Sequence, residues 1–436
     1  MKGKKISTLV GVVLVVIAVC FIFIASGKKA EGPKPGEKVQ VTVYGWLTTY
    51  AKPFSEVLKE KVEAKYPNIE IVYQEATYEE TGTQYLLMAE SGDVPDVCYT
   101  ELIMSNELAS IDALEDLRDW LSPEVINDLA PAAYDACMYK GKLTSIIWDI
   151  SPYCLFSSST MAKKVGYDSP PRTFDEFEEM VYAIAGLGTD KAGNKIWGTN
   201  IAGLEDIHVP FLFSPWLYNF GGQWFDKNGK SAINSPEAVK LVTWFKKMYD
   251  DGVFGPVPID RETNRTLFME GHLGFIGEGP WQRGIWRDRS GKGEAFDQEW
   301  WLDTYPTKDG SPGKSIMWSS NCAIMKAAKH KEEAAKVIEM WVADPEVVLA
   351  YGRLNGGIPA VKSIQNLAEV QNDPYRKVFV DAIQAGGTLP FSPFATKINE
   401  CGIMFARAFQ DILLNDAPIK KTLDELAANM NRVVSE

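Results

Sequence analysis

Short apolar runs alternate with helical patterns along the first part of the chain, and this alternation constrains the fold more than any other feature. A helix that contains Pro53 early and ends at Pro67 separates the first two runs, and Gly92 to Pro95 forms a turn before the third. Strands that alternate with helices favour a parallel sheet with helices on both faces. We therefore predict an α/β fold with strands at 39–44, 69–73 and 96–99 and helices between them.

Length and composition limit the classes of protein that fit. A chain of 436 residues exceeds one ordinary core and implies about two or three domains. The formal charge of −13 argues against nucleic acid or an anionic lipid surface as the main partner. The five cysteines after Cys20 are scattered without a CxxC pair, and the three histidines have no metal or triad spacing. We expect no metal, no cofactor and no disulfide framework, although one bridge between unassigned cysteines stays open.

The N-terminus has the pattern of a targeting segment. Lysines precede an apolar run over residues 6–25, which is about long enough to span a bilayer. Ala25-Ser26-Gly27 offers small residues for cleavage, so residues 1–27 form either a cleaved export signal or a retained membrane anchor. Lipid attachment at Cys20 is disfavoured because Val19 stands where such signals need a small residue. Residues 28–38 form a linker, and the rest of the chain is expected outside the cytoplasm.

The stretch 267–286, LFMEGHLGFIGEGPWQRGIW, is the strongest candidate for a binding segment. An apolar strand at 273–276 is broken by Gly277, Gly279 and Pro280. Ligands of open α/β sheets bind at the carboxyl ends of strands. The residues presented there combine an indole with polar groups, which suits the apolar faces and hydroxyl edges of a sugar: Glu278, Trp281, Gln282 and Arg283. The alternative is that Trp281 only fills a gap in the core.

Eight stretches, taken together and in order, resemble the extracellular solute-binding proteins of carbohydrate ABC transporters, the group that contains maltose-binding protein. They cover nearly all of the chain after the linker, and each is weak alone. They are YPNIEIVYQ (66–74), LLMAESGDVPDV (86–97), YKGKLTSIIWDIS (139–151), VGYDSPPRTFDEFEEM (165–180), FGGQWFDKNGKSAINSPEAVKLVTWFKKMYDDG (220–252), FMEGHLGFIGEGPW (268–281), HKEEAAKVIEMWVADPEV (330–347) and NGGIPAVKS (355–363).

The resemblance implies two α/β lobes joined by three crossings, with the ligand in a cleft between them. Lobe 1 would comprise 39–149 and 321–356, and lobe 2 would comprise 152–317 and 362–436. The crossings would lie at 150–151, 318–320 and 357–361. Pro152 and Gly357-Ile358-Pro359 interrupt regular structure at the first and third, while the second rests on the resemblance alone.

The resemblance also implies a set of ligand contacts. Trp281 corresponds to a tryptophan that stacks on a sugar ring in the family. A carboxylate in an apolar strand exit needs a partner, so Asp149 is expected either to bind ligand hydroxyls or to pair with a nearby Arg or Lys. The expected contacts are Trp46, Thr48, Thr100, Glu101, Trp148, Asp149, Phe211, Trp216, Glu278, Trp281, Arg283, Trp318, Ser320, Asn321, Lys397 and Glu400.

The function implied is that of an extracytoplasmic binding component of an ABC importer, without a catalytic step. It would close over a di- or oligosaccharide and deliver it to the permease, as a monomer that contacts the membrane through its N-terminal segment. Three alternatives stay open: a sensor or adhesin that does not transport, a binder of a non-sugar solute such as a polyamine or an organic phosphate, and an extracellular glycosidase. No carboxylate pair stands out for the last.

Overall fold

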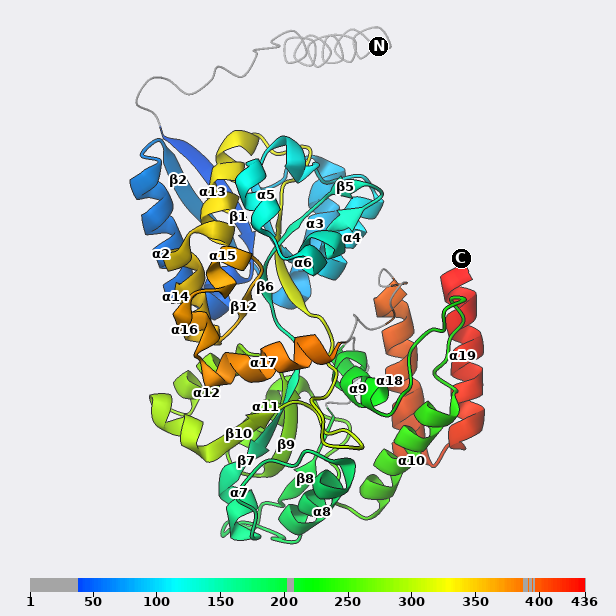
Figure 1. The fold of residues 1–436 in the computed structure, drawn as a ribbon. Helices are drawn as coiled ribbons and strands as arrows, with labels where there is room; N and C mark the ends of the chain where they lie inside the picture. Colours follow the sequence, from blue (N-terminus) through cyan, green and yellow to red (C-terminus); the bar gives the residue numbers. More distant parts are fainter. Residues whose placement is uncertain (1–37, 202–207, 387–390, 392–393, 395–396, 436) are drawn as a thin grey trace, which may run out of the picture.

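Two β-sheets, each covered by helices, form the two halves of the computed structural model (Figure 1). The structure describes residues 38–201, 208–386, 391, 394 and 397–435, so the predicted signal or anchor and nearly all of the linker lie outside the described residues. Within those ranges, no helix combines the length and the apolar character that crossing a membrane requires. We call the half around the six-stranded sheet the upper half and the other the lower half, as they lie in Figure 1. The predicted α/β, two-lobed fold is confirmed.

The upper sheet mixes parallel and antiparallel strands in the order β12-β6-β11-β3-β1-β2. β1 runs parallel to β2 and β3, as predicted, but β11 is antiparallel to β3 and β6. The parallel arrangement predicted for the first three strands is therefore confirmed, and β11 runs the other way because the chain enters it from the lower half. The strands are β1 (Val39–Gly45), β2 (Ile69–Glu75), β3 (Val97–Glu101), β6 (Ile146–Ile150), β11 (Ser319–Ala323) and β12 (Ile358–Pro359).

The helices of the upper half pack on both faces of this sheet. Phe54, Leu58 and Val62 recur every four residues on the first of them and are completely buried, which makes one apolar stripe against the sheet. A short hairpin of β4 (Met138–Tyr139) and β5 (Lys142–Leu143) lies beside them. The helices are α2 (Leu47–Lys65), α3 (Tyr78–Ser91), α4 (Leu102–Ser110), α5 (Pro123–Asp128), α6 (Pro131–Ala136), α13 (Lys331–Ala343), α14 (Pro345–Asn355), α15 (Lys362–Gln365) and α16 (Ala368–Gln371).

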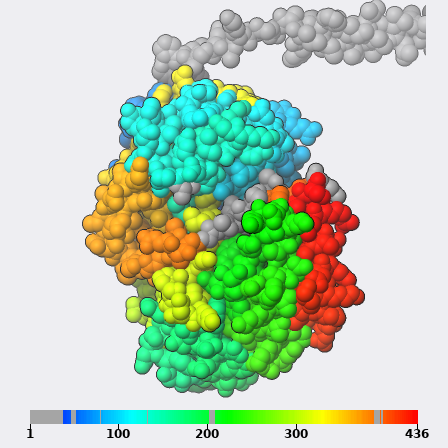
Figure 2. Space-filling view, turned by 45° about the vertical axis from the view of Figure 1, so that its right-hand side comes forward, coloured from blue at the N-terminus to red at the C-terminus, as the bar shows by residue number. Residues whose placement is uncertain are grey.

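The lower sheet has four strands in the order β10-β7-β9-β8. They are β7 (Cys154–Ser158), β8 (Trp197–Thr199), β9 (Leu273–Glu278) and β10 (Trp300–Asp303). The helices of this half are α7 (Ser159–Lys164), α8 (Phe174–Ala185), α9 (His208–Asn219), α10 (Pro236–Asp250), α11 (Arg261–Met269), α12 (Gln282–Arg289), α17 (Pro374–Ala385), α18 (Ile398–Asn415) and α19 (Ile419–Ser435). α18 and α19 lie together against α9 and α10 at one side of this half (Figures 1 and 2).

Helix starts in the lower half show what local sequence signals could and could not reveal. The capping box predicted at α8 is present: the N–H of Glu176 donates to Thr173 Oγ1 at 3.2 Å, and the N–H of Thr173 donates to Glu176 Oε2 at 3.0 Å. The sequence did not predict α9, which contains Pro215. Its residues 209–217 are buried among aromatic side chains, so tertiary packing outweighs the hydrogen bond that proline removes.

The two halves are joined by chain crossings and by a shared apolar core. The first two crossings lie side by side, since the N–H of Ser151 donates to the carbonyl of Trp318 at 2.8 Å. Near α12 and α14 the core of the upper half continues into the lower half, where it includes Phe156, Trp286 and Trp300. This side of the boundary is therefore firmly packed and can act as the pivot if the halves rotate.

The lobe boundaries drawn from the sequence stay a prediction. α15 begins at Lys362, where the second lobe was expected to resume. The side chain of Lys362 donates to the carbonyl of Asn127 at 2.8 Å, and the N–H of Ser363 donates to Asp128 at 3.1 Å. Both acceptors lie in the upper half. These bonds favour a third crossing that follows α15.

Candidate functional site

Aromatic side chains of the upper half gather where β1 and β3 end. Trp46 follows β1, and its ring centroid lies 4.2 Å from that of Tyr99 and 5.1 Å from that of Tyr78, the first residue of α3. Gly45 lets the chain turn here, because its φ is +143° and a Cβ on it would lie 2.9 Å from the carbonyl oxygen of Tyr99. The backbone thus folds Trp46 onto Tyr99 and sets both at the edge that faces the lower half.

Trp281 follows the corresponding strand end in the lower half. It stands immediately before α12, is only partly buried, and meets Tyr153 edge to face with centroids 5.5 Å apart. Its ring folds back over Gly279, where a Cβ would lie 2.2 Å from the ring atom Cη2. Gly279, which interrupts the strand, therefore also makes room for the indole. Trp281 is not sealed in the core, which leaves its predicted role as a ligand contact open.

Rings from both halves meet at the boundary. Trp318 lies at the second crossing and is supported edge-on by Phe211 at 4.7 Å. On its other side, Tyr78 of the upper half lies 6.2 Å from Trp318 and 6.0 Å from His208, measured between ring centroids. The aromatic boundary, as we call Trp46, Tyr78, Tyr153, Trp281 and Trp318, thus receives side chains from both halves.

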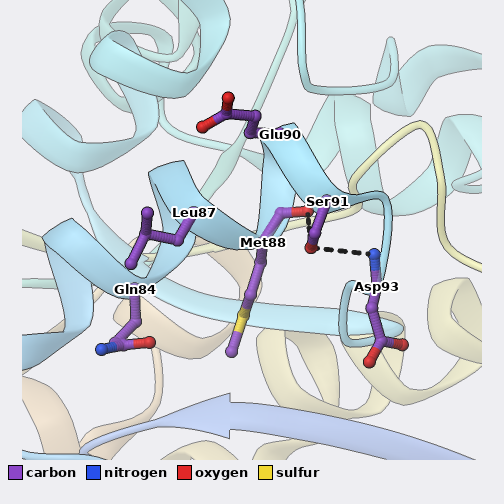
Figure 3. A pocket seen from close by; sticks show the side chains of 6 residues that line it. All are labelled: Gln84, Leu87, Met88, Glu90, Ser91 and Asp93. Carbon is purple, nitrogen blue, oxygen red and sulfur yellow. Dashed lines mark hydrogen bonds between the residues drawn. The ribbon is translucent and has the colours of Figure 1, made fainter.

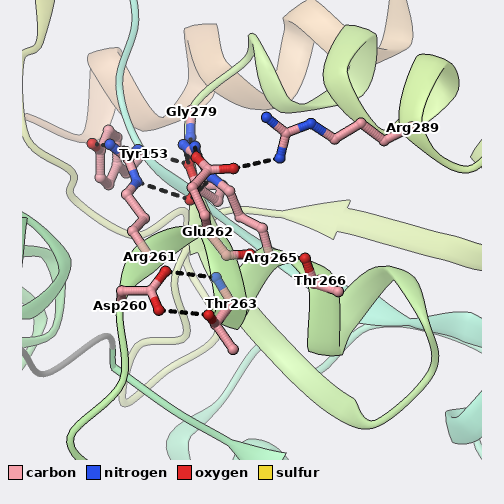
Figure 4. Close-up of polar contacts among 10 residues, drawn as sticks. Tyr153, Asp260, Arg261, Glu262, Thr263, Arg265, Thr266, Gly279 and Arg289 are labelled. Carbon is pink, nitrogen blue, oxygen red and sulfur yellow. Dashed lines mark hydrogen bonds and ion pairs between the residues drawn. The ribbon is translucent and has the colours of Figure 1, made fainter.

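Glu278, the last residue of β9, is the centre of a buried ion cluster that includes Arg261 and Arg265. Figure 4 shows these two arginines with Tyr153 and Glu262. Only 1% of its side chain is exposed, and its carboxylate accepts N–H groups from Arg261 and Arg265 at 2.8–3.1 Å. Burial alone would raise the pKa of Glu278, but the two guanidinium groups lower it to about 2. The two arginines engage both oxygen atoms of Glu278, and its role as a ligand contact stays a prediction.

Asp149 belongs to the hinge. Its carboxylate accepts a hydrogen bond from Ser151 Oγ at 2.6 Å, and a Cβ on Gly357 would lie 1.8 Å from its Oδ1. Burial raises the pKa of Asp149 to about 7, against the opposing effects of Ser151 and the charge of Arg376. Asp149 is thus enclosed between two crossings, and its direct contact with ligand stays a prediction.

Thr100 and Glu101 serve the fold locally. Glu101 precedes α4, and its carboxylate accepts the N–H groups of Ile103 at 2.8 Å and Met104 at 2.9 Å. Burial raises the pKa of Glu101 to about 8, although these two bonds lower it. Thr100 is completely buried and bonds to Ser105. Glu101 thus caps α4, and the role of both residues as polar ligand contacts stays a prediction.

Three more predicted contacts are core residues. Trp148, which is 1% exposed, stacks on Phe54 with centroids 5.4 Å apart. Trp216 is buried edge-on against Tyr305 at 5.1 Å. Asn321 is fully buried and donates to Ser145 Oγ at 2.9 Å. Trp148 lies near the end of β6, where a side chain can point to either face of the sheet, and the sequence does not reveal which face.

Three further candidates lie at the boundary, behind it or at the pivot. Ser320 keeps a place at the boundary, since its hydroxyl lies 3.3 Å from that of Tyr99. Phe211 is fully buried and acts only by supporting Trp318. Arg283 is buried with its guanidinium 4.0 Å from the ring centroid of Tyr375, so it packs at the pivot and does not reach the boundary.

Two candidates lie at the start of α18, and one lies in α2. Lys397 and Glu400 form an ion pair at 3.5 Å, and Glu400 is exposed. Their assignment as ligand contacts stays a prediction. Thr48 was expected in a loop but lies in the first turn of α2, where its side chain is outside the described residues.

Sequence reasoning missed three residues of this region: Tyr78, Tyr153 and Arg261. Tyr153 directly follows Pro152 at the first crossing, and Tyr78 begins the helix after β2, so strand ends could have indicated both. Arg261 begins α11, far from any strand end in sequence, and only the fold brings it next to Tyr153.

Other features of the described residues give no competing site. An open hollow on α3 is lined by Gln84, Leu87, Met88, Glu90, Ser91 and Asp93 (Figure 3). It offers neither an aromatic face nor a buried polar group, and it lies apart from the predicted residues. No three His, Cys, Asp or Glu side chains within the described ranges are grouped to hold a metal ion. The five cysteines after Cys20 are buried free thiols.

Comparison with known proteins gives consistent matches along the chain. A family model described as bacterial extracellular solute-binding protein matches residues 57–378. The maltotriose-binding protein of Pyrococcus abyssi is 24% identical over 396 residues, which span 86% of this chain and 78% of that protein. The arabinooligosaccharide-binding protein of Bacillus subtilis is 25% identical over 282 residues, or 63% of this chain and 60% of that protein.

Solved structures agree with the architecture. A receptor of Streptomyces glaucescens, determined without ligand and with acarbose, superposes with a TM-score of 0.78 at 18% identity and covers 92% of this chain and 99% of its own. A maltose/maltodextrin-binding domain of Bdellovibrio bacteriovorus bound to maltotriose gives a TM-score of 0.75 at 17% identity, over 91% of this chain and 100% of its own. At this identity the likeness shows the fold.

Proposed function

Because the chain belongs to the family of bacterial extracellular solute-binding proteins, we propose that it is the receptor of an ABC importer and binds a di- or oligosaccharide between its two halves. Binding proteins for maltotriose and for arabinooligosaccharides are among its relatives, which supports a sugar over a polyamine or an organic phosphate. The protein binds and releases its ligand unchanged, outside the cytoplasm.

The aromatic boundary is the observation that carries this proposal. Sugar rings have apolar C–H faces that pack on flat aromatic rings, and their hydroxyl groups need polar partners at the rim. Trp46 and Tyr78 come from the upper half, while Trp281 and Trp318 come from the lower half and the second crossing. A sugar held by rings from both halves makes its full set of contacts only when the halves are together. Such extra contacts are what a ligand needs to drive closure.

Entry of the ligand requires the boundary to open. Tyr78 and Trp318 are in contact across it, so a sugar can enter only when the upper and lower halves move apart. The packed core around α12 and α14 provides the pivot, and the adjacent crossings at Ser151 and Trp318 absorb the rotation. The closed form then docks on the membrane subunits of the transporter. We further propose that the receptor acts as a monomer and stays near the membrane through its N-terminal segment.

A binding screen tests the proposal. Ligand that binds the folded state raises its melting temperature, so a thermal-shift screen with glucose, maltotriose and arabinotriose, followed by titration calorimetry, should identify a sugar with micromolar or tighter affinity, about −8 kcal/mol. Spermidine and glycerol 3-phosphate represent the non-sugar alternatives. The bound sugar should be recovered intact by chromatography. Binding of spermidine or glycerol 3-phosphate without any sugar would contradict the proposal, and release of hydrolysis products would favour a glycosidase.

A further inference from the structure

Arg261 lies beside Tyr153 of the aromatic boundary (Figure 4), and its partners among the described residues use only part of its guanidinium group. Its Nε donates to Glu278 Oε1 at 3.1 Å, and its Nη2 donates to Glu278 Oε2 at 2.8 Å and to Tyr153 Oη at 3.0 Å. Among the described residues no hydrogen bond to Nη1 is found, and 18% of the side chain is exposed. Two N–H donors on Nη1 therefore remain for a ligand.

The position of these donors is fixed. Glu278 is buried, and its second partner, Arg265, is buried as well, so the carboxylate cannot turn away from Arg261. The guanidinium carbon of Arg261 lies 5.6 Å from the ring centroids of both Tyr153 and Trp281. The N–H donors of Nη1, which are held beside an indole, are preorganised to bind an oxygen-bearing group next to a stacked ring.

Among the described residues, the buried part of the cluster carries more positive than negative charge. One buried carboxylate, Glu278, faces two guanidinium groups, and the other carboxylate that pairs with Arg265 is the half-exposed Glu262, which also pairs with Arg289. Uncompensated positive charge in an aromatic environment favours an anionic partner.

We propose that Arg261 is a ligand-binding residue that pairs with a carboxylate, so that the receptor prefers an oligosaccharide carrying a uronic acid over its neutral counterpart. This inference rests on the proposed function and names the class of sugar. A pair of neighbouring hydroxyls could accept the same two N–H groups. Hydroxyls would leave the two guanidinium groups of Arg261 and Arg265 with only one buried carboxylate between them, and for that reason a carboxylate is the better partner.

Matched ligands test the inference. Oligogalacturonates and glucuronate-bearing xylo-oligosaccharides should be titrated calorimetrically beside their carboxyl-reduced counterparts, at low and high salt. We expect the acidic form of the bound sugar to bind at least about tenfold tighter, with a preference that shrinks as salt rises. Neutral forms that bind as tightly as the acidic forms would overturn the inference and leave the proposed function standing. If neither form of any oligosaccharide binds, the proposed function itself fails.

Variants place the preference on Arg261. Arg261→Gln should reduce the preference for the acidic sugar to within about threefold. Arg261→Lys keeps the charge but not the planar guanidinium group, and it should retain part of the preference. Arg289→Gln is the matched control, because Arg289 is an exposed arginine that pairs with Glu262 in the same cluster. It should leave the preference unchanged. Circular dichroism and melting temperature confirm folding, and a preference that persists in both folded Arg261 variants would overturn the assignment.

Discussion

Replacing Glu278 by glutamine should weaken the fold strongly, because this carboxylate compensates two guanidinium groups in the interior. It accepts four hydrogen bonds from Arg261 and Arg265, and glutamine offers one acceptor oxygen and turns an N–H₂ group toward the same donors. Losing two charge-assisted bonds costs about 3–6 kcal/mol, and the partial exposure of Arg261 favours the lower end. The shift of the Glu278 pKa from 4.5 to about 2 independently corresponds to about 3 kcal/mol.

Urea unfolding followed by tryptophan fluorescence measures this loss. We expect Glu278→Gln to lower the free energy of unfolding by about 3 kcal/mol at pH 7. Glu425→Gln is the control, since Glu425 forms an exposed pair with Lys421 at 3.8 Å and its loss should change stability by less than about 0.5 kcal/mol. The folded pKa of Glu278 lies below the unfolded one, so its contribution is present above about pH 4.5 and is lost as the pH falls toward 2. A loss under about 1 kcal/mol at pH 7 would refute this account of the cluster.

Three further changes test separate parts of the structure. Trp281→Ala should weaken binding of the sugar found in the screen by at least about 1.5 kcal/mol with folding intact, and unchanged affinity in titration calorimetry would remove Trp281 from the site. Gly357→Ala should lower the free energy of unfolding by about 1–3 kcal/mol, because its Cβ would lie 1.8 Å from Asp149 Oδ1, and an unchanged urea midpoint would show that the hinge is less tightly packed than described. Native Glu101 keeps its proton up to about pH 8, whereas the unfolded chain releases it above about pH 4.5, so wild-type stability should fall across this window by up to about 1.4 kcal/mol per pH unit. Glu101→Gln should flatten that slope, and parallel curves for the two proteins would contradict the raised pKa.

Local signals in the sequence predicted individual strands and helices, whereas the division into two lobes came from the resemblance to a known family. The alternating strand at β1, the capping box at Thr173 and the glycine and proline breaks after β9 each act within a few residues. Such patterns do not depend on the rest of the fold, and they predict elements well. α9 was missed because its stability comes from burial among aromatic residues of α10 and α18, which no local pattern of Pro215 and its neighbours reveals.

The site was predicted less completely, for a physical reason. Strand ends located Trp46 and Trp281 near the boundary, and the resemblance located Trp318 there. Neither determines on which side of the chain a ring lies. Trp148 ends on the core side of its strand, stacked on Phe54. Glu278 looked like a free polar group because its two arginine partners stand 13 and 17 residues earlier in the chain. Long-range pairing of this kind depends on the folded arrangement.

The distance between the two halves with and without sugar tests the central claim most directly. Spin labels at Gln84→Cys on α3 and Asn399→Cys on α18 lie at exposed positions of the upper and lower halves, and the native cysteines after Cys20 are buried. With Cys20 replaced by serine, pulsed electron resonance then reports one distance between the halves. We predict that saturating sugar shortens this distance and narrows its distribution. An unchanged distribution at a sugar concentration that calorimetry shows to be saturating would contradict closure of the two halves over the ligand.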